Sequence, residues 1–251
     1  MQDERFLLFC FPYAGGTSDF YNDIEEACGD RVEFVKLDYA GHGKRMKEKL
    51  CQSIGELTED LLPQVKKRLK ANPGMSYAMM GYSMGSIVMF DMLIRIAAIS
   101  DCRLPWGVFI SAHEPQPIES LKHIPEENTD DWVKERTIEF GGIDKRLLNN
   151  SSFWRIYLPI FKADYKMIAD YRFADISFTT NVPATVFYSE EDTPLREMQE
   201  WKRYFVGDCD FVSYNGSHFF IENNYQDMAD IIVRKHQSFN DPAPDSGDIN
   251  E

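Results

Sequence analysis

The sequence lacks any run of about 18 apolar residues, so we expect no transmembrane helix. Its first residues, MQDERFLLFCF, lack the cationic start and the small-residue cleavage site of a signal peptide. The five cysteines are dispersed and form no C-x-x-C pair, which indicates reduced thiols and a cytoplasmic location. Cys, His and Asp residues show no metal-ligand spacing, so we expect no metal ion.

Positive charge is scarce. The 251 residues hold 27 Lys and Arg against 41 Asp and Glu, which gives a formal net charge of -14. This surplus of negative charge argues against nucleic acid and anionic membranes as partners. The length fits one large domain or two small ones, and we expect a monomer.

The pattern G-x-S-x-G is present as GYSMG, centred on Ser83. An apolar stretch at 75–80 precedes it, and a long apolar stretch at 87–98 without Gly or Pro follows it. Between a strand and a helix this pattern is typical of a nucleophile elbow, a strained turn that exposes the serine oxygen. A side chain at Gly81 or Gly85 would collide with the neighbouring strand or helix. An ordinary serine-containing turn is the alternative, and the flanking stretches favour the elbow.

Further short apolar runs indicate strands buried on both faces, and amphipathic stretches between them indicate helices. The expected strands are 5–11, 32–37, 106–111, 184–188 and 210–214, and the expected helices include 19–28, 53–69 and 193–205. The alternation predicts an α/β protein with the α/β-hydrolase fold, a mostly parallel central sheet flanked by helices.

Between about 113 and 180 the strand pattern stops. Helices are expected at 129–140, 144–149 and 152–171. Helices alone, inserted between strands, predict a helical lid over the carboxyl edge of the sheet. We therefore expect a core of residues 1–112 and 181–240, a lid of residues 113–180 and a disordered acidic tail of residues 241–251.

A serine nucleophile needs a histidine base and a carboxylate that orients it. Acids follow the strand at 184–188, and among Glu190, Glu191 and Asp192 the short side chain of Asp192 is favoured. His218 follows the last strand, so Ser83, Asp192 and His218 occur in the chain order of the α/β-hydrolases.

Two other histidines are weaker candidates for the base. His42 precedes the serine and lies between glycines, so we expect a solvated loop residue. His236 falls inside the terminal helix and is expected at the surface. An oxyanion hole would use the N–H of Met84, which follows the serine, and an N–H from the glycine-rich loop at 12–17, where Ala14 is the best candidate.

Taken together, the motifs resemble those of the type II thioesterases, which accompany polyketide and nonribosomal peptide synthetases. The resemblance runs from about residue 5 to residue 235. It is carried by Phe11-Pro12-Tyr13-Ala14-Gly15-Gly16, Gly81-Tyr82-Ser83-Met84-Gly85, Asp131-Trp132, Gly141-Gly142, Leu158-Pro159-Ile160, Ala163-Asp164-Tyr165, Tyr171-Arg172 and Gly216-Ser217-His218-Phe219-Phe220. One departure lies after the second strand, where the family's Pro-Gly-Arg turn is replaced by Tyr39-Ala40-Gly41-His42-Gly43.

The resemblance implies hydrolysis of acyl thioesters on the phosphopantetheine arm of acyl or peptidyl carrier domains, which removes stalled or aberrant acyl groups. It implies Ser83 as nucleophile, Asp192 as acid, His218 as base and the Ala14 and Met84 N–H groups as oxyanion donors, with no cofactor. Three alternatives stay open: a medium-chain fatty acyl-carrier-protein thioesterase, a small-molecule esterase, and a non-catalytic binding protein of the same fold.

Overall fold

A single six-stranded sheet organises the chain, which a computed structural model describes at residues 5–115 and 129–241. All neighbouring strands pair in parallel, in the order β2-β1-β3-β4-β5-β6. The strands are β1 (Phe6–Phe11), β2 (Val32–Lys36), β3 (Tyr77–Tyr82), β4 (Gly107–Ser111), β5 (Ala184–Ser189) and β6 (Cys209–Tyr214). The parallel sheet confirms the predicted fold class.

Strand β1 is buried on both of its faces, as its apolar run predicts. Because successive side chains point to opposite faces, the strand contributes to two separate hydrophobic clusters. One cluster takes Leu7, Phe9 and Phe11, and the other takes Phe6, Leu8 and Cys10.

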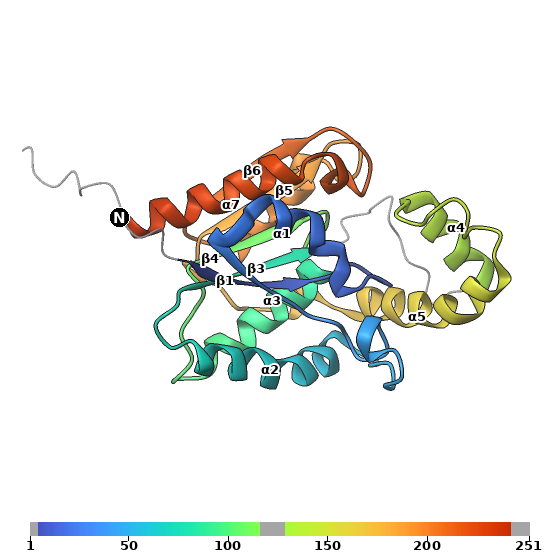
Figure 1. The fold of residues 1–251 in the computed structure, drawn as a ribbon, viewed down its shortest axis with the longest axis horizontal. Helices are drawn as coiled ribbons and strands as arrows, with labels where there is room; N and C mark the ends of the chain where they lie inside the picture. The colour runs from blue at the N-terminus through green and yellow to red at the C-terminus, as the bar shows by residue number, and fades with distance from the viewer. Residues whose placement is uncertain (1–4, 116–128, 242–251) are drawn as a thin grey trace, which may run out of the picture.

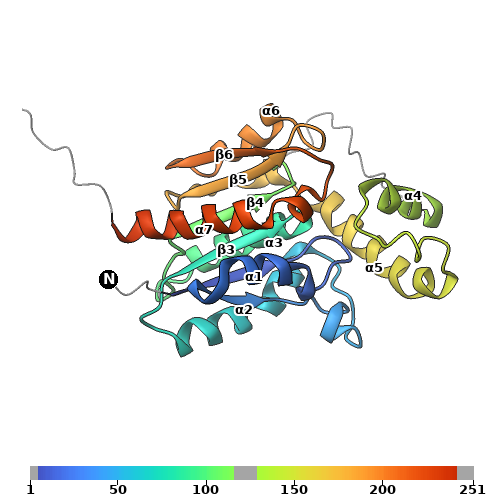
Figure 2. The same ribbon diagram turned by 45° about the horizontal axis from the view of Figure 1, so that its top comes forward.

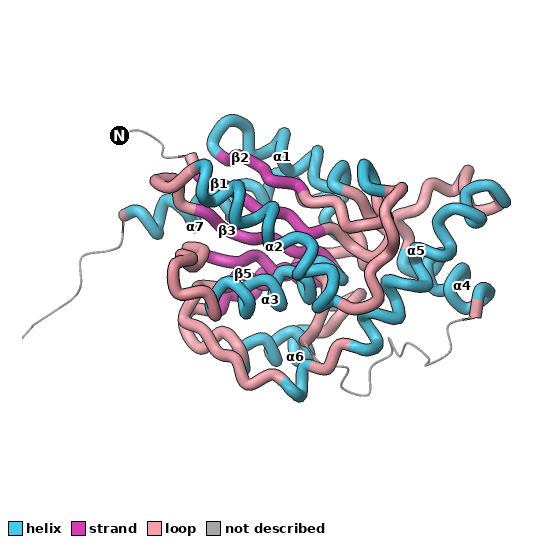
Figure 3. Tube along the Cα trace, turned by 90° about the horizontal axis from the view of Figure 1, so that it is seen from below, coloured by secondary structure: helices cyan, strands magenta, loops and turns pink. Residues whose placement is uncertain are grey.

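Helices cover both faces of the sheet (Figures 1 and 3). One face carries α1 (Asn22–Cys28) and α7 (Tyr225–Asn240), and the other carries α2 (Ile54–Ala71) and α3 (Met84–Ala97). Helix α2 begins with the Ser53 half of the predicted capping box, while Glu56 bonds one residue earlier than the box requires. The Ser53 side chain accepts from the N–H of Glu56, and the Glu56 carboxylate accepts from the N–H of Gln52.

Apart from α4 and α5, the remaining helical elements are short. They are α6 (Leu195–Met198) and the 3₁₀ turns η1 (Ser18–Tyr21), η2 (Gly29–Arg31), η3 (Gly43–Arg45), η4 (Phe173–Asp175), η5 (Gln199–Arg203) and η6 (Phe220–Asn223). The helix expected at 19–28 therefore splits into η1 and α1, and the helix expected at 193–205 is α6 followed by η5. Within the two described stretches, none of the helices has the length and apolar character needed to cross a bilayer.

Two lid helices, α4 (Asp130–Phe140) and α5 (Ser151–Asp170), extend beyond the carboxyl ends of the strands (Figures 1 and 2). They are joined by the ion pair of Lys162 with Asp130, at 2.7 Å, and by a hydrogen bond between the hydroxyls of Thr137 and Tyr165, at 3.0 Å. The division at 113 and 180 stays a prediction. The expected tail, apart from its first residue, lies outside the described residues.

The helix predicted at 144–149 is wrong. The chain there forms turns, with Leu147 N–H donating to the carbonyl of Asp144. The Asp144 carboxylate also accepts from the N–H of Arg146, at 2.8 Å. An aspartate that bonds to a nearby backbone N–H in this way offers the chain an alternative to helical hydrogen bonds.

The prediction that His236 lies at the surface is also wrong, because its side chain is only 4% exposed. Its ring packs on Phe6 and Trp106, and its Nε2 lies 2.9 Å from the Ser76 hydroxyl. Helical residues four apart share one face, and His236 continues the buried series of Met228 and Ile232 on α7.

Candidate active site

The candidate site lies where the order of the strands reverses. From β1 the chain moves outward to β2 and then returns across β1 to form β3, so the loops after β1 and β3 diverge from adjacent strands. In parallel sheets a ligand crevice forms at such a point, beyond the carboxyl ends of the strands. The residue pair Phe11 and Gly81 ends the ladder there, directly before the glycine-rich loop and the serine turn.

Ser83 occupies the turn between β3 and α3, as the elbow pattern predicts. Its backbone angles are φ 53° and ψ -121°, a conformation that residues with a side chain rarely adopt. The Ser83 N–H donates to the carbonyl of Ser111 on β4, at 2.8 Å. This bond to a central strand holds the strained turn, because the rest of β4 is fixed by the sheet.

The steric prediction for the two glycines of the elbow is confirmed. A Cβ at Gly85 would lie 1.9 Å from the carbonyl oxygen of Phe11, and a Cβ at Gly81 would lie 2.3 Å from the carbonyl oxygen of Gly85. Both obstacles are backbone atoms, which cannot rotate away as a flexible side chain can. The turn therefore has room for hydrogen only at these positions.

Ser83, His218 and Asp192 form one chain of hydrogen bonds. The Nε2 of His218 lies 2.9 Å from the Oγ of Ser83, although 135 residues separate them, and Nδ1 lies 3.0 Å from the Oδ1 of Asp192. The side chains of His218 and Asp192 are 7% and 5% exposed. An imidazole between a hydroxyl and a carboxylate is the arrangement that activates a serine for nucleophilic attack.

The turns that carry the acid and the histidine are tied together. The Ser189 hydroxyl, at the end of β5, donates to the carbonyl of Gly216, and the Gly216 N–H donates to the Glu191 carboxylate at 3.1 Å. Glu190 instead accepts from the N–H of Leu195. Both glutamates are exposed and bind backbone N–H groups, while Asp192 faces the imidazole.

The two predicted oxyanion donors come from different elements. Met84 opens helix α3, and Ala14 lies in the turn after β1 that the bond from Gly16 N–H to the Tyr13 carbonyl closes. Both residues are buried, at 0% and 7% exposed. Within the described part of the chain, neither N–H donates a hydrogen bond, so both groups are available for an anionic oxygen.

His42 does not behave as the sequence led us to expect. It is only 2% exposed, and its Nε2 lies 2.9 Å from the Oδ2 of Asp164, a fully buried residue of lid helix α5. The expectation of a solvated loop residue is wrong because α5 covers the turn after β2. Asp164 was not identified as a functional residue. Its signal was present, however: an acid between Phe161 and Tyr165 on the apolar face of a helix needs a partner.

Phe140 is a second residue near the site that sequence reasoning did not single out. Its ring lies 4.4 Å from the imidazole of His218, centroid to centroid, and the guanidinium of Arg136 lies over the Phe140 ring at 4.2 Å. The last turn of lid helix α4 therefore covers the histidine of the triad.

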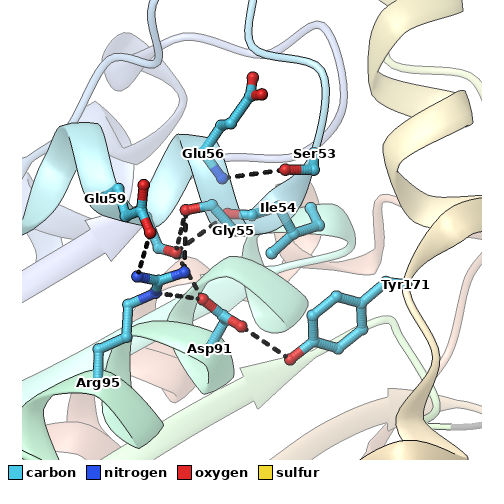
Figure 4. A network of polar contacts seen from close by, with 9 residues as sticks. Ser53, Ile54, Gly55, Glu56, Glu59, Asp91, Arg95 and Tyr171 are labelled. Carbon is cyan, nitrogen blue, oxygen red and sulfur yellow. Dashed lines mark hydrogen bonds and ion pairs between the residues drawn. The ribbon is translucent and has the colours of Figure 1, made fainter.

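The C-terminal end of α5 is bound to the core by a polar network with α2 and α3 (Figure 4). The Tyr171 hydroxyl donates to the Oδ1 of Asp91 at 3.3 Å, and Arg95 donates to Asp91, to Glu59 and to the carbonyl of Gly55. Burial and the Asp91 carboxylate raise the pKa of Tyr171, so the phenol keeps the proton that it donates.

Over the described ranges, no three Cys, His, Asp or Glu side chains are grouped to hold a metal ion.

Curated relatives are similar over most of the chain. Thioesterase PikA5 of Streptomyces venezuelae is 25% identical over 240 residues, which cover 95% of this chain and 83% of that protein. The human medium-chain S-acyl fatty acid synthase thioesterase is 25% identical over 229 residues, which cover 87% of this chain and 82% of that protein.

Solved structures share the fold. ClbQ from the colibactin NRPS/PKS pathway superimposes with a TM-score of 0.83 at 23% identity, covering 94% of this chain and 99% of that one. The type II thioesterase BorB from the borrelidin cluster gives a TM-score of 0.77 at 22% identity, covering 94% of both chains. The thioesterase domain family matches residues 6–238, nearly the whole chain, and the protein is therefore a member of the thioesterase family.

Proposed function

We propose that this thioesterase hydrolyses acyl thioesters on the phosphopantetheine arm of carrier proteins, and that it clears stalled or aberrant acyl groups from a polyketide or nonribosomal peptide synthetase. The observation that carries the proposal is the hydrogen-bonded series of Ser83, His218 and Asp192 beneath the lid. Relatives named for synthetase pathways, such as the probable cadicidin and anguibactin biosynthesis thioesterases, support the substrate class.

In the proposed reaction His218 takes the proton of Ser83 as the serine oxygen attacks the thioester carbonyl. The carbonyl oxygen becomes an anion held by the N–H groups of Ala14 and Met84, and each such donor is worth about 3 kcal/mol. The C–S bond then breaks, and His218 returns the proton to the pantetheine thiolate. Asp192 orients the imidazole and stabilises its charged form.

Hydrolysis of the acyl-serine completes the cycle. A water molecule gives its proton to His218 and attacks the ester carbonyl, the same two N–H groups hold the oxyanion, and the proton passes to the Ser83 oxygen as it leaves. The products are a free acid and a free thiol on the carrier arm. Water and the residues of the chain suffice for every step, so the proposal needs no cofactor. It places a monomeric enzyme beside its synthetase in the cytoplasm.

The test is a panel of carrier proteins loaded with acyl groups of different length and branching, followed by mass spectrometry of acyl loss. The wild type should unload at least part of the panel, and Ser83→Ala should unload none of it. Wild-type protein that leaves every carrier loaded would reject the proposal. Labelling of Ser83 by a fluorophosphonate reports separately on the nucleophile.

A medium-chain fatty acyl thioesterase is the second candidate, favoured by the human relative of that name. The same panel separates the two, because this candidate predicts preference for straight saturated chains on a fatty acid carrier. A small-molecule esterase would instead hydrolyse free esters faster than carrier-bound thioesters of the same acyl group.

A further inference from the structure

Gly15, the residue after the proposed oxyanion donor Ala14, is held by lid helix α5 in two ways. Its N–H donates to the Oδ2 of Asp164 at 2.6 Å. The ring of Phe161 also covers it so closely that a Cβ at Gly15 would lie 2.1 Å from the ring. Phe161 and Asp164 are three residues apart and share one face of α5, so one surface of the lid rests on this loop.

The buried carboxylate has a counter-charge in His42. The imidazole faces two acceptors: Nδ1 lies 3.1 Å from the carbonyl of Ala40, and Nε2 lies 2.9 Å from Asp164. Only an imidazolium carries a proton on both nitrogens and satisfies both acceptors. Three segments therefore converge on this carboxylate: the turn after β2, the loop after β1 and the lid.

This ion pair is poorly explained as a device for stability alone. Asp164 is 0% exposed, and within the described residues its Oδ1 has no hydrogen-bond partner. A buried charge pair costs desolvation energy that often exceeds its attraction, and an unpaired buried oxygen adds to that cost.

We propose that Asp164 is a positioning residue for the loop at 12–17. It holds this loop so that the Ala14 N–H is aligned with the substrate oxygen only while α5 lies against the loop. The inference rests on the proposed function, in which Ala14 is an oxyanion donor. The peptide between Ala14 and Gly15 is planar, so the bond to Asp164 fixes that plane. Only the two backbone dihedrals of Ala14 then separate the fixed plane from the N–H that binds the substrate oxygen.

The arrangement couples the position of the lid to the chemistry. While α5 covers the loop, the donor is aligned. When α5 moves away, Gly15 loses its acceptor and the alignment relaxes. Lid closure that completes a catalytic site is a general way to restrict reaction to the enclosed substrate.

The test compares Asp164→Leu and Asp164→Asn with Tyr171→Phe, using a medium-chain acyl N-acetylcysteamine thioester as the probe. Asp164→Leu removes the acceptor, so kcat should fall about 100-fold, the cost of losing one oxyanion donor, with KM within about threefold of wild type. Asp164→Asn keeps an oxygen that can accept from the Gly15 N–H, so the kcat of this variant should fall by about tenfold or less. Tyr171→Phe breaks a different contact between the lid and the core and should keep kcat within about twofold.

A second measurement does not depend on turnover. In ¹⁵N-resolved NMR spectra the Gly15 amide proton should shift upfield in both Asp164 variants and stay in place in Tyr171→Phe, because hydrogen bonds to charged acceptors are the stronger ones. Phosphonylation of Ser83 should also slow in Asp164→Leu, since the phosphonate oxygen occupies the same donors. Circular dichroism and thermal unfolding establish that each variant folds.

The outcomes separate the two proposals. A folded Asp164→Leu that keeps wild-type kcat, or a Gly15 resonance that does not move in Asp164→Asn, overturns the role of Asp164. If Asp164→Leu does not fold, the Gly15 amide resonance of Asp164→Asn still tests the role of Asp164. If the wild type hydrolyses no acyl thioester, the proposed function fails, while the Gly15 resonance and the Ser83 phosphonylation rate still decide whether Asp164 holds the loop.

Discussion

The ring of Phe140 packs on the imidazole of His218 with their centroids 4.4 Å apart. Phe140 belongs to lid helix α4, whereas His218 lies in the turn after β6. The contact covers the imidazole from water and restricts its rotation. Helix α5 also contacts Gly15, so the two lid helices contact two separate parts of the candidate site.

The Phe140 contact predicts that Phe140→Ala lowers kcat by about tenfold, because a less constrained imidazole is less often aligned with the serine. The free energy of unfolding should also fall, by about 0.5–1.5 kcal/mol beyond the effect of the lost apolar area. The control is Phe153→Ala, another lid aromatic, which stacks on Tyr157 at 4.7 Å. Steady-state kinetics and urea unfolding measure both effects. Equal losses of kcat in the two variants would show that His218 does not depend on Phe140.

Ser83 stores backbone strain, and glycine should release it. Ser83→Gly and Ser83→Ala should both lose about 10⁴-fold or more in kcat, because each removes the nucleophile. Glycine has no Cβ to clash at φ 53°, so its variant should be more stable than the alanine variant by about 1 kcal/mol. Chemical denaturation of the two proteins provides the comparison, and an alanine variant of equal stability would show that the turn is unstrained.

The acid of the triad can be tested against its neighbour. Asp192→Asn should lower kcat by about 10⁴-fold, because an amide favours the wrong tautomer of His218 and does not stabilise its cation. Glu190→Gln changes an exposed acid two residues away, which accepts from the Leu195 N–H, and should keep nearly full activity. The variants should have similar melting temperatures. A greater loss of kcat in the Glu190 variant would move the acid's role to that residue.

His42 should make stability depend on pH. Burial lowers its pKa, but Asp164, the Ala40 carbonyl and Asp38 together raise it above the ordinary 6.5. The folded protein therefore binds the proton more tightly than the unfolded chain. This contribution to the free energy of unfolding is fully present below pH 6.5 and is lost as the pH rises through the folded-state pKa.

His42→Gln lacks this titration, so the stability advantage of the wild type over the variant should shrink as the pH rises. Urea unfolding of both proteins between pH 6 and pH 9 measures the difference. A constant advantage would mean that folding leaves the pKa of His42 unchanged, and an advantage that grows with pH would mean that folding lowers it.

Gly85 should tolerate no side chain. In Gly85→Ala the new Cβ meets the Phe11 carbonyl, so either β1 or α3 must move, and the variant should lose more than about 3 kcal/mol of stability. Gly74→Ala is the matched control, because a Cβ there has no atom within 4 Å. Thermal unfolding distinguishes the two. A stable Gly85→Ala protein would show that the elbow can relax.

Local pattern alone predicted the strands, the elbow at Ser83 and the chain order of the three triad residues. These features depend on side-chain periodicity and on the steric needs of a tight turn, which neighbouring residues express directly. The same pattern predicted Ala14 and Met84 as oxyanion donors, because each follows within three residues of a strand end that the apolar runs mark.

Only the tertiary structure determined which polar side chains are buried and which residues they contact. The sequence places His42 between two glycines and indicates a loop residue, but α5 covers it. The apolar face of α5 shows that Asp164 needs a partner, and only the fold shows that His42 and Gly15 supply it. The packing of Phe140 on His218 likewise joins residues 78 positions apart. Such contacts depend on where the lid docks on the sheet, and that docking is the sum of many long-range interactions that no short stretch of sequence contains.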